Sequence, residues 1–165
     1  MAGVPGPRVI VGMDNSYGSL AALRFGVAEA ARRGCELMLA HAVQGLVPHN
    51  SWPAERERAR ARMNANLYQS LGGPPPGLRI CYAILEYIEP GPGLAGLATP
   101  NDLLVVGKRP SRRHLWWRPG TDTYCARHAP CPVVVVPPPA LLDLVRTARR
   151  RRDLRRSLDQ LTVTT

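Results

Sequence analysis

The sequence lacks a long apolar run, has few aromatic residues and contains almost no lysine. Aromatic residues make up 5% of the 165 positions, and Lys108 is the only lysine in the chain. No apolar stretch approaches the roughly 20 residues that cross a bilayer, so we expect no membrane-spanning helix. The opening MAGVPGPRVIVGMD has neither a charged start nor a cleavage site, and therefore predicts no signal peptide.

Signatures of the common hydrolases and kinases are also missing. The sequence contains no GxxxxGK[ST], HExxH or GxSxG pattern. His41 falls in a buried strand pattern and is interpreted as a core histidine with its hydrogen bonds satisfied. Cys131, between two prolines, is interpreted as a buried structural thiol. We assign no catalytic residue.

Cysteine is scarce and irregularly spaced. The four thiols have neither paired metal-ligand spacing nor the density of a disulfide framework, and they are Cys35, Cys81, Cys125 and Cys131. The sequence therefore predicts no metal site and a reduced, cytoplasmic protein.

What the chain does have is an apolar content of 45% and a net charge of +10. This length and composition suit one globular domain with its own core. The positive charge gathers in two places, a central loop that contains Arg109, Arg112 and Arg113, and the segment after Ala140.

The chain is organised around residues 102–136. Two short apolar, β-rich runs, Leu103–Val106 and Val133–Val136, predict strands buried on both faces, as in a parallel sheet. Between them lie a polar loop and a predicted helix that begins at Gly120-Thr121 and extends to His128. The loop and the helix start follow the carboxyl end of a strand, where α/β sheets bind ligands. Free N–H groups at such a helix start suit a phosphate.

The rest of the chain repeats the alternation of strand and helix. We expect strands at residues 8–13, 36–43 and 78–85, a helix that Gly34 ends, and a helix over 53–71 whose charged residues form a solvated face. Prolines and glycines between residues 89 and 100 leave space only for a short or irregular helix. Residues 141–161 predict an additional basic helix.

Two stretches resemble the universal stress protein family: RVIVGMDNSYGSLAALRFGVAEAARRGCELMLAHAV and VVG…GT…ARHAPCPVVVV. The resemblance spans residues 8–137. It implies an α/β fold, a three-layer α/β/α sandwich with a five-stranded parallel, Rossmann-like sheet. It implies frequent homodimers through the last strand, Val133–Val136, and ATP binding in one branch. We therefore expect a family-like domain at 1–139 and a C-terminal basic helical extension at 140–165.

The resemblance also implies a set of nucleotide-binding positions. Asp14 matches the acid near ribose and adenine, and Ala42 matches a backbone position beside adenine. The phosphate-loop positions are Gly107, Gly120, Thr121 and Thr123. Arg109, with Arg112 and Arg113, is a candidate for supplying phosphate charge.

The loop departs from the family pattern. Pro110 stands where ATP binders have a second glycine, and proline lacks an N–H and has a fixed φ. The helix that starts at Gly120 is one residue shorter before the HAPCP stretch. Both changes predict a degenerate or modified adenine-nucleotide site.

Two further features suggest partners. Trp116 and Trp117, flanked by Arg118, are typical of an interface anchor, and a lid over the site or a stacking surface for nucleic acid are the alternatives. The basic tail could meet nucleic acid or an anionic surface, but we favour a helix packed through its leucines.

The leading hypothesis is a cytoplasmic regulatory or interaction protein, a homodimer with a degenerate or modified adenine-nucleotide site. The alternatives are an ATP-binding stress sensor, with at most slow ATP hydrolysis, and a nucleic-acid-associated protein that uses the basic loop and tail.

Overall fold

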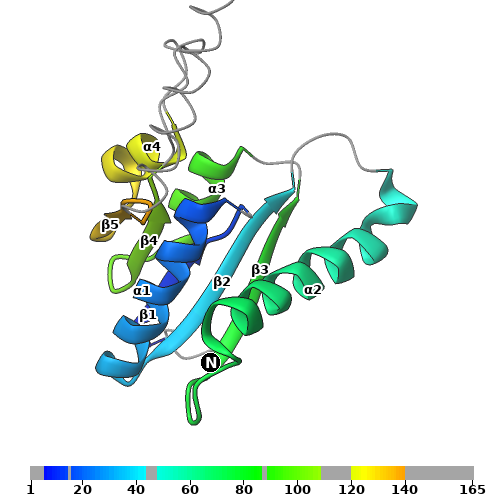
Figure 1. Cartoon of the computed structure of the whole chain (residues 1–165). Helices are drawn as coiled ribbons and strands as arrows, with labels where there is room; N and C mark the ends of the chain where they lie inside the picture. The colour runs from blue at the N-terminus through cyan, green and yellow to red at the C-terminus, as the bar shows by residue number, and fades with distance from the viewer. Residues whose placement is uncertain (1–5, 15, 44–47, 87–88, 109–119, 140–165) are drawn as a thin grey trace, which may run out of the picture.

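The computed structural model describes residues 6–14, 16–43, 48–86, 89–108 and 120–139. Strands and helices alternate along these residues, apart from one short 3₁₀ turn at His49–Ser51. The elements in chain order are β1 (Arg8–Gly12), α1 (Tyr17–Arg33), β2 (Glu36–Val43), α2 (Trp52–Leu71), β3 (Ile80–Glu86), α3 (Pro90–Leu97), β4 (Leu103–Gly107), α4 (Thr121–His128) and β5 (Val133–Val136) (Figure 1).

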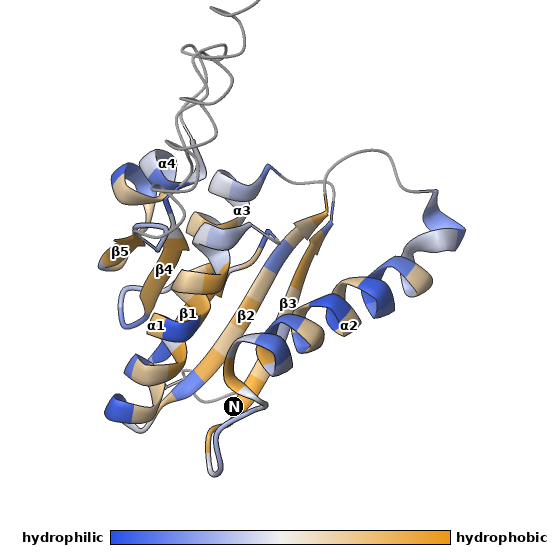
Figure 2. Ribbon diagram, viewed as in Figure 1, coloured by the Kyte–Doolittle hydropathy of each residue, from blue (hydrophilic) through white to orange (hydrophobic). Residues whose placement is uncertain are grey.

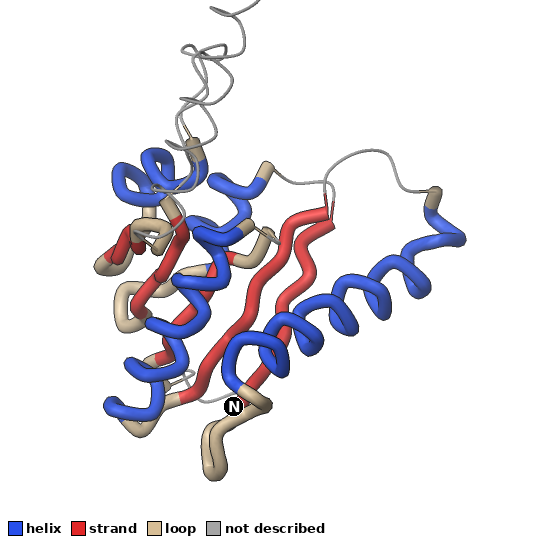
Figure 3. The backbone as a smooth tube through the Cα atoms, in the orientation of Figure 1, coloured by secondary structure: helices blue, strands red, loops and turns tan. Residues whose placement is uncertain are grey.

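The five strands form one parallel sheet in the order β3-β2-β1-β4-β5 (Figure 3). The expected five-stranded parallel sheet is therefore confirmed, and β5 lies at one edge of it. From β1 the sheet grows first through β2 and β3, then in the opposite direction through β4 and β5. This reversal puts a topological switch point between the carboxyl ends of β1 and β4.

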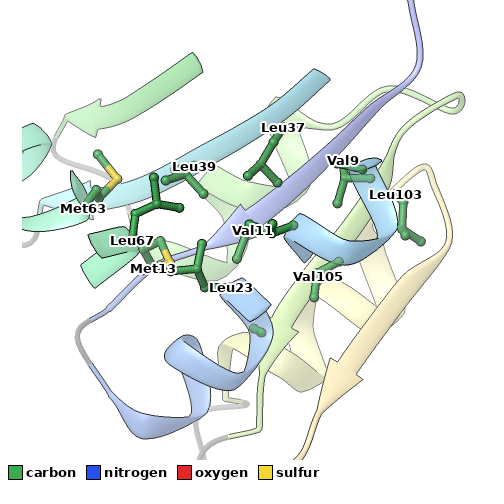
Figure 4. Close-up of a cluster of buried hydrophobic side chains, with 13 residues drawn as sticks. Val9, Val11, Met13, Leu23, Leu37, Leu39, Met63, Leu67, Leu103 and Val105 are labelled. Atoms are coloured by element: carbon green, nitrogen blue, oxygen red, sulfur yellow. The ribbon is translucent and has the colours of Figure 1, made fainter. Parts of the chain in front are cut away.

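Side chains alternate between the two faces of the sheet, as a period of two requires. Val9, Val11 and Met13 join a buried cluster with residues of α1 and α2, whereas Ile10 joins a second cluster with residues of α3 and α4. The first cluster lies between the sheet and the helices α1 and α2, which contribute Leu23, Met63 and Leu67 (Figure 4). Two clusters on opposite faces make the predicted three layers.

Local signals set the helix ends. The Ser16 hydroxyl accepts a hydrogen bond from the Ser19 N–H at 3.1 Å, which caps α1. Gly34 and Gly72 end α1 and α2 with φ of 62° and 77°, a conformation that glycine adopts without strain. The outward side of α2 is strongly hydrophilic, as expected for a solvated face (Figure 2).

The helix between β3 and β4 is short, as its prolines and glycines predict: α3 has 8 residues. Gly91 allows a close approach to α4, because a Cβ at this position would lie 2.9 Å from the Tyr124 Cβ. Four strand boundaries differ by one or two residues from the sequence prediction: β1 ends at Gly12, β3 is Ile80–Glu86 and β4 ends at Gly107. The Leu78 N–H donates to the Pro75 carbonyl in a turn, so β3 begins only at Ile80. The predicted C-terminal helix lies outside the described residues.

Candidate functional site

A cavity of about 320 Å³ opens at the switch point of the sheet. The carboxyl ends of three strands form its base, through residues 12–14, 40–43 and 106–107. The first turns of α3 and α4 form one side, and Glu55 and Arg62 of α2 form the other. Its volume lies within the usual range for small-molecule sites.

Gly107 allows the backbone of α1 to reach the end of β4. A Cβ on Gly107 would lie 2.3 Å from the Gly18 carbonyl carbon and 2.6 Å from the Ser19 nitrogen. These contacts are with backbone atoms, which cannot swing aside. Glycine at this position is therefore required by the packing of α1 on β4, whatever the cavity binds.

Asp14 follows β1 and holds a turn at the mouth of the cavity. Its Oδ1 accepts a hydrogen bond from the Ser16 N–H at 3.0 Å, in the segment that leads into α1. Asp14 also lines the cavity. One residue therefore both forms the turn and belongs to the cavity wall.

His41 lies on β2 against the last residue of the β1 segment. Its Nδ1 is 2.7 Å from the Met13 carbonyl oxygen, and a carbonyl can only accept, so Nδ1 carries the hydrogen. The neutral ring then has its lone pair on Nε2. The histidine has a partner, as expected, but it is half-buried and lines the cavity, a position that the strand pattern alone does not indicate.

The contribution of α2 was also missed. Arg62 forms an ion pair of 3.0 Å with Glu55, whose side chain is 19% exposed. The charges of α2 are a solvated face for the most part, but these two residues are seven positions apart and so share one side of the helix. The seven-residue spacing of Glu55 and Arg62 is the sequence feature from which their shared side of the helix could have been predicted.

The start of α4 forms the remaining wall. Gly120 is the residue before the helix, and Thr121 and Asp122 line the cavity. Thr123 is exposed and lies outside the lining. Arg109, Trp116 and Trp117 lie outside the described residues.

One glycine pattern has a different role from the one it suggests. Gly91, Gly93 and Gly96 have the spacing GxGxxG, which is typical of dinucleotide-binding loops. In the structure they belong to α3 itself, and Gly91 packs against Tyr124 of α4. At Gly91, therefore, the glycine serves the packing of α3 on α4 beside the cavity.

The described residues can be compared with two common kinds of reactive site, a metal centre and a nucleophilic thiol. Among the described residues no group of three or more His, Cys, Asp or Glu side chains is arranged to hold a metal ion. Burial raises the pKa of Cys131, and burial together with the Asp122 charge raises the pKa of Cys125 to about 11. Thiols with raised pKa values are poor nucleophiles.

The fold is that of a doubly wound α/β protein with a cavity at its switch point. The chain belongs to the universal stress protein family, whose family model matches residues 7–137. No curated protein sequence matches the chain. None of the helices in the described part of the chain is long and apolar enough to cross a membrane.

Solved structures of the same family share this fold. The universal stress protein UspA from Lactobacillus plantarum is 22% identical, with a TM-score of 0.58 over 81% of this chain and 99% of that chain. A universal stress protein in complex with cAMP is 25% identical, with a TM-score of 0.57 over 82% of this chain and 99% of that chain. One from Archaeoglobus fulgidus in complex with dAMP is 18% identical, with a TM-score of 0.55 over 79% and 97% of the two chains.

Proposed function

We propose that this protein is a regulatory protein that binds an adenine nucleotide in the cavity at its switch point. The observation that carries the proposal is the convergence of four positions from separate segments. Asp14, Ala42, Gly107 and Thr121 all line the same cavity. The local sequence around each of these four residues does not by itself predict that they lie together.

The lining offers complementary groups for each part of such a ligand. Leu94 and Val106 are buried and apolar, as a base-binding slot requires. The Asp14 carboxylate and the Nε2 lone pair of His41 are acceptors for hydroxyl or amino groups. The start of α4 offers backbone N–H groups to a phosphate.

The family relationship supports the same ligand class. The cAMP complex has 25% identity to this chain, and cAMP carries adenine, ribose and a single phosphate. The open cavity of about 320 Å³ supports a modified adenine-nucleotide site rather than a degenerate site that no longer binds a ligand.

The test is calorimetric titration of adenosine and AMP into protein freed of carried-over nucleotide. Ala42→Phe places a ring in the cavity and should weaken binding by about tenfold or more, that is by at least ~1.4 kcal/mol. Ala61→Phe, at an exposed position of α2, is the matched control and should bind like the wild type. Absence of binding by adenosine and AMP at millimolar concentration would contradict the proposal.

We also propose that the protein is a homodimer through β5. The two edges of the sheet differ in character. Beside β3, Arg56 pairs with Glu86 and Arg60 lies over the Tyr82 ring, so charges protect that edge. At the other edge β5 is a run of four half-exposed valines, an apolar edge that favours pairing.

Light scattering coupled to size-exclusion chromatography tests the dimer. Val134→Lys should convert it to a monomer, because a charge on this edge opposes close strand pairing. Ile84→Lys, a half-buried position on β3, is the control and should leave the mass unchanged. Equal behaviour of the two variants would exclude β5 as the interface.

Two other partners stay predictions: a protein partner at Trp116 and Trp117, and nucleic acid on the tail. Salt-dependent binding measurements can test them.

A further inference from the structure

We propose that Asp122 limits how many phosphates the bound ligand carries, so that the cavity accepts nucleosides and monophosphates and disfavours triphosphates. This inference rests on the proposed nucleotide-binding function. It assigns a selectivity role to a residue that the family resemblance did not single out.

The position of Asp122 is the first argument. It is in the first turn of α4, is half-buried and lines the cavity. Its Oδ1 is 2.5 Å from the point where a Cβ on Gly120 would lie. The carboxylate thus folds back against the residue that precedes the helix. A negative oxygen therefore lies close to the helix start, where it weakens the attraction for negative charge beyond that of a first phosphate.

The charge of the lining is the second argument. Asp14 and Glu55 are the other acidic residues of the described lining, and Arg62 is its one arginine or lysine. Arg62 already pairs with Glu55 at 3.0 Å, and no described lysine or arginine forms an ion pair with Asp122. Each phosphate adds negative charge, so repulsion from Asp122 grows from AMP to ATP.

A purely structural role makes a different prediction. Acidic residues in the first turn of a helix stabilise it through the helix dipole. If that were the whole role of Asp122, its replacement would lower the melting temperature and leave the preference among nucleotides unchanged. The ratio of ATP affinity to adenosine affinity therefore distinguishes a selectivity role of Asp122 from a purely structural one.

The experiment measures the affinities of adenosine, AMP, ADP and ATP in EDTA, by calorimetry, for the wild type, Asp122→Asn and Asp122→Glu. The ratio of ATP affinity to adenosine affinity should rise about tenfold or more in Asp122→Asn, because an amide of the same shape removes the charge. In Asp122→Glu, which keeps the charge, the ratio should stay near that of the wild type.

Two outcomes would overturn the inference while the proposed function stands. One is binding of adenosine and AMP with the same ratio in all three proteins. The other is an ATP affinity that falls in Asp122→Asn when Mg²⁺ replaces EDTA, since Asp122 would then favour phosphates through the cation. If neither adenosine nor AMP binds any of the three proteins, the proposed function itself fails and this inference fails with it.

Discussion

Arg8 and Asp102 form a buried ion pair that joins the beginnings of the two central strands. The Arg8 Nε donates to Oδ1 at 3.1 Å and the second guanidinium branch to Oδ2 at 2.8 Å, while the Arg8 backbone N–H donates to Oδ1 at 3.0 Å. Thr99 adds its N–H and its hydroxyl, both 2.8 Å from Oδ2. The Asp102 side chain has 0% exposure. This contact lies at the amino ends of β1 and β4, whereas the cavity lies at the carboxyl ends of the strands.

We expect Asp102→Asn to destabilise the fold by about 3 kcal/mol, since removing one member leaves a largely buried guanidinium without its carboxylate. Urea unfolding followed by circular dichroism measures this difference. Glu57→Gln, at an exposed position of α2, is the control and should change the free energy of unfolding by less than about 0.5 kcal/mol. A similar small effect in both variants would show that the ion pair contributes little.

The same carboxylate should make stability depend on acid pH. Burial opposes the charge of Asp102, but the hydrogen bonds from Arg8 and Thr99 outweigh it and lower the pKa from 3.8 to about 2. The unfolded chain therefore binds this proton more readily than the folded chain. The stabilisation is present above pH 4 and is lost as the pH falls from about 4 to about 2, with an amplitude of roughly 2 kcal/mol.

Urea unfolding at a series of pH values between 2 and 6 should show this loss in the wild type and a shallower loss in Asp102→Asn. Part of the slope will remain, because hydrogen bonds from Arg32 and Arg33 also lower the pKa of Glu29 to about 2. Parallel pH profiles in the two proteins would contradict the assignment to Asp102.

Gly107→Ala should destabilise the protein by about 2 kcal/mol and weaken nucleotide binding, because the new Cβ would overlap the backbone of Gly18 and Ser19. Gly96→Ala is the matched control in α3. A Cβ at Gly96 meets nothing within 4 Å, so this exchange should stabilise the protein by up to about 1 kcal/mol through helix propensity. Thermal unfolding and calorimetry measure the two effects. A neutral Gly107→Ala would show that α1 can move away from β4.

Cys81 and Cys125 should be nearly unreactive in the folded protein. Burial, together with Glu36 for Cys81 and Asp122 for Cys125, raises each thiol pKa from 9.0 to about 11. At pH 8 the thiolate fraction is then roughly a hundredfold lower than for an ordinary thiol. Iodoacetamide labelling read by peptide mass spectrometry should modify both residues at least that much more slowly in buffer than in urea. Rapid labelling of Cys125 in buffer would contradict its burial.

The type and order of the elements could be predicted from the sequence, because these depend on patterns within a few residues. The apolar run Glu36–Val43 was predicted with the bounds that β2 has in the structure. Gly34 ends α1 where its conformational freedom predicted. The brevity of α3 followed from prolines and glycines in one short stretch. In each case the deciding interactions are local.

Part of the candidate site could also be predicted, but only through resemblance to a family. The cavity does bring Asp14, Ala42, Gly107 and Thr121 together. Thr123 is on the same helix but outside the lining, since neighbouring residues on a helix point in different directions. Whether any of these residues contacts a nucleotide stays a prediction for the titrations above.

Hydrophobic period, capping and the backbone preferences of glycine and proline were enough to predict the order of strands and helices, and the glycines that end α1 and α2. They could not predict which side chains meet across the fold. Arg8 and Asp102 are 94 positions apart, and Glu55 reaches the cavity because α2 packs against β3 and α1. The interactions that form a helix or a strand act between residues close together in the chain. Ion pairs such as Arg8–Asp102, and cavities, depend instead on how complete elements pack together.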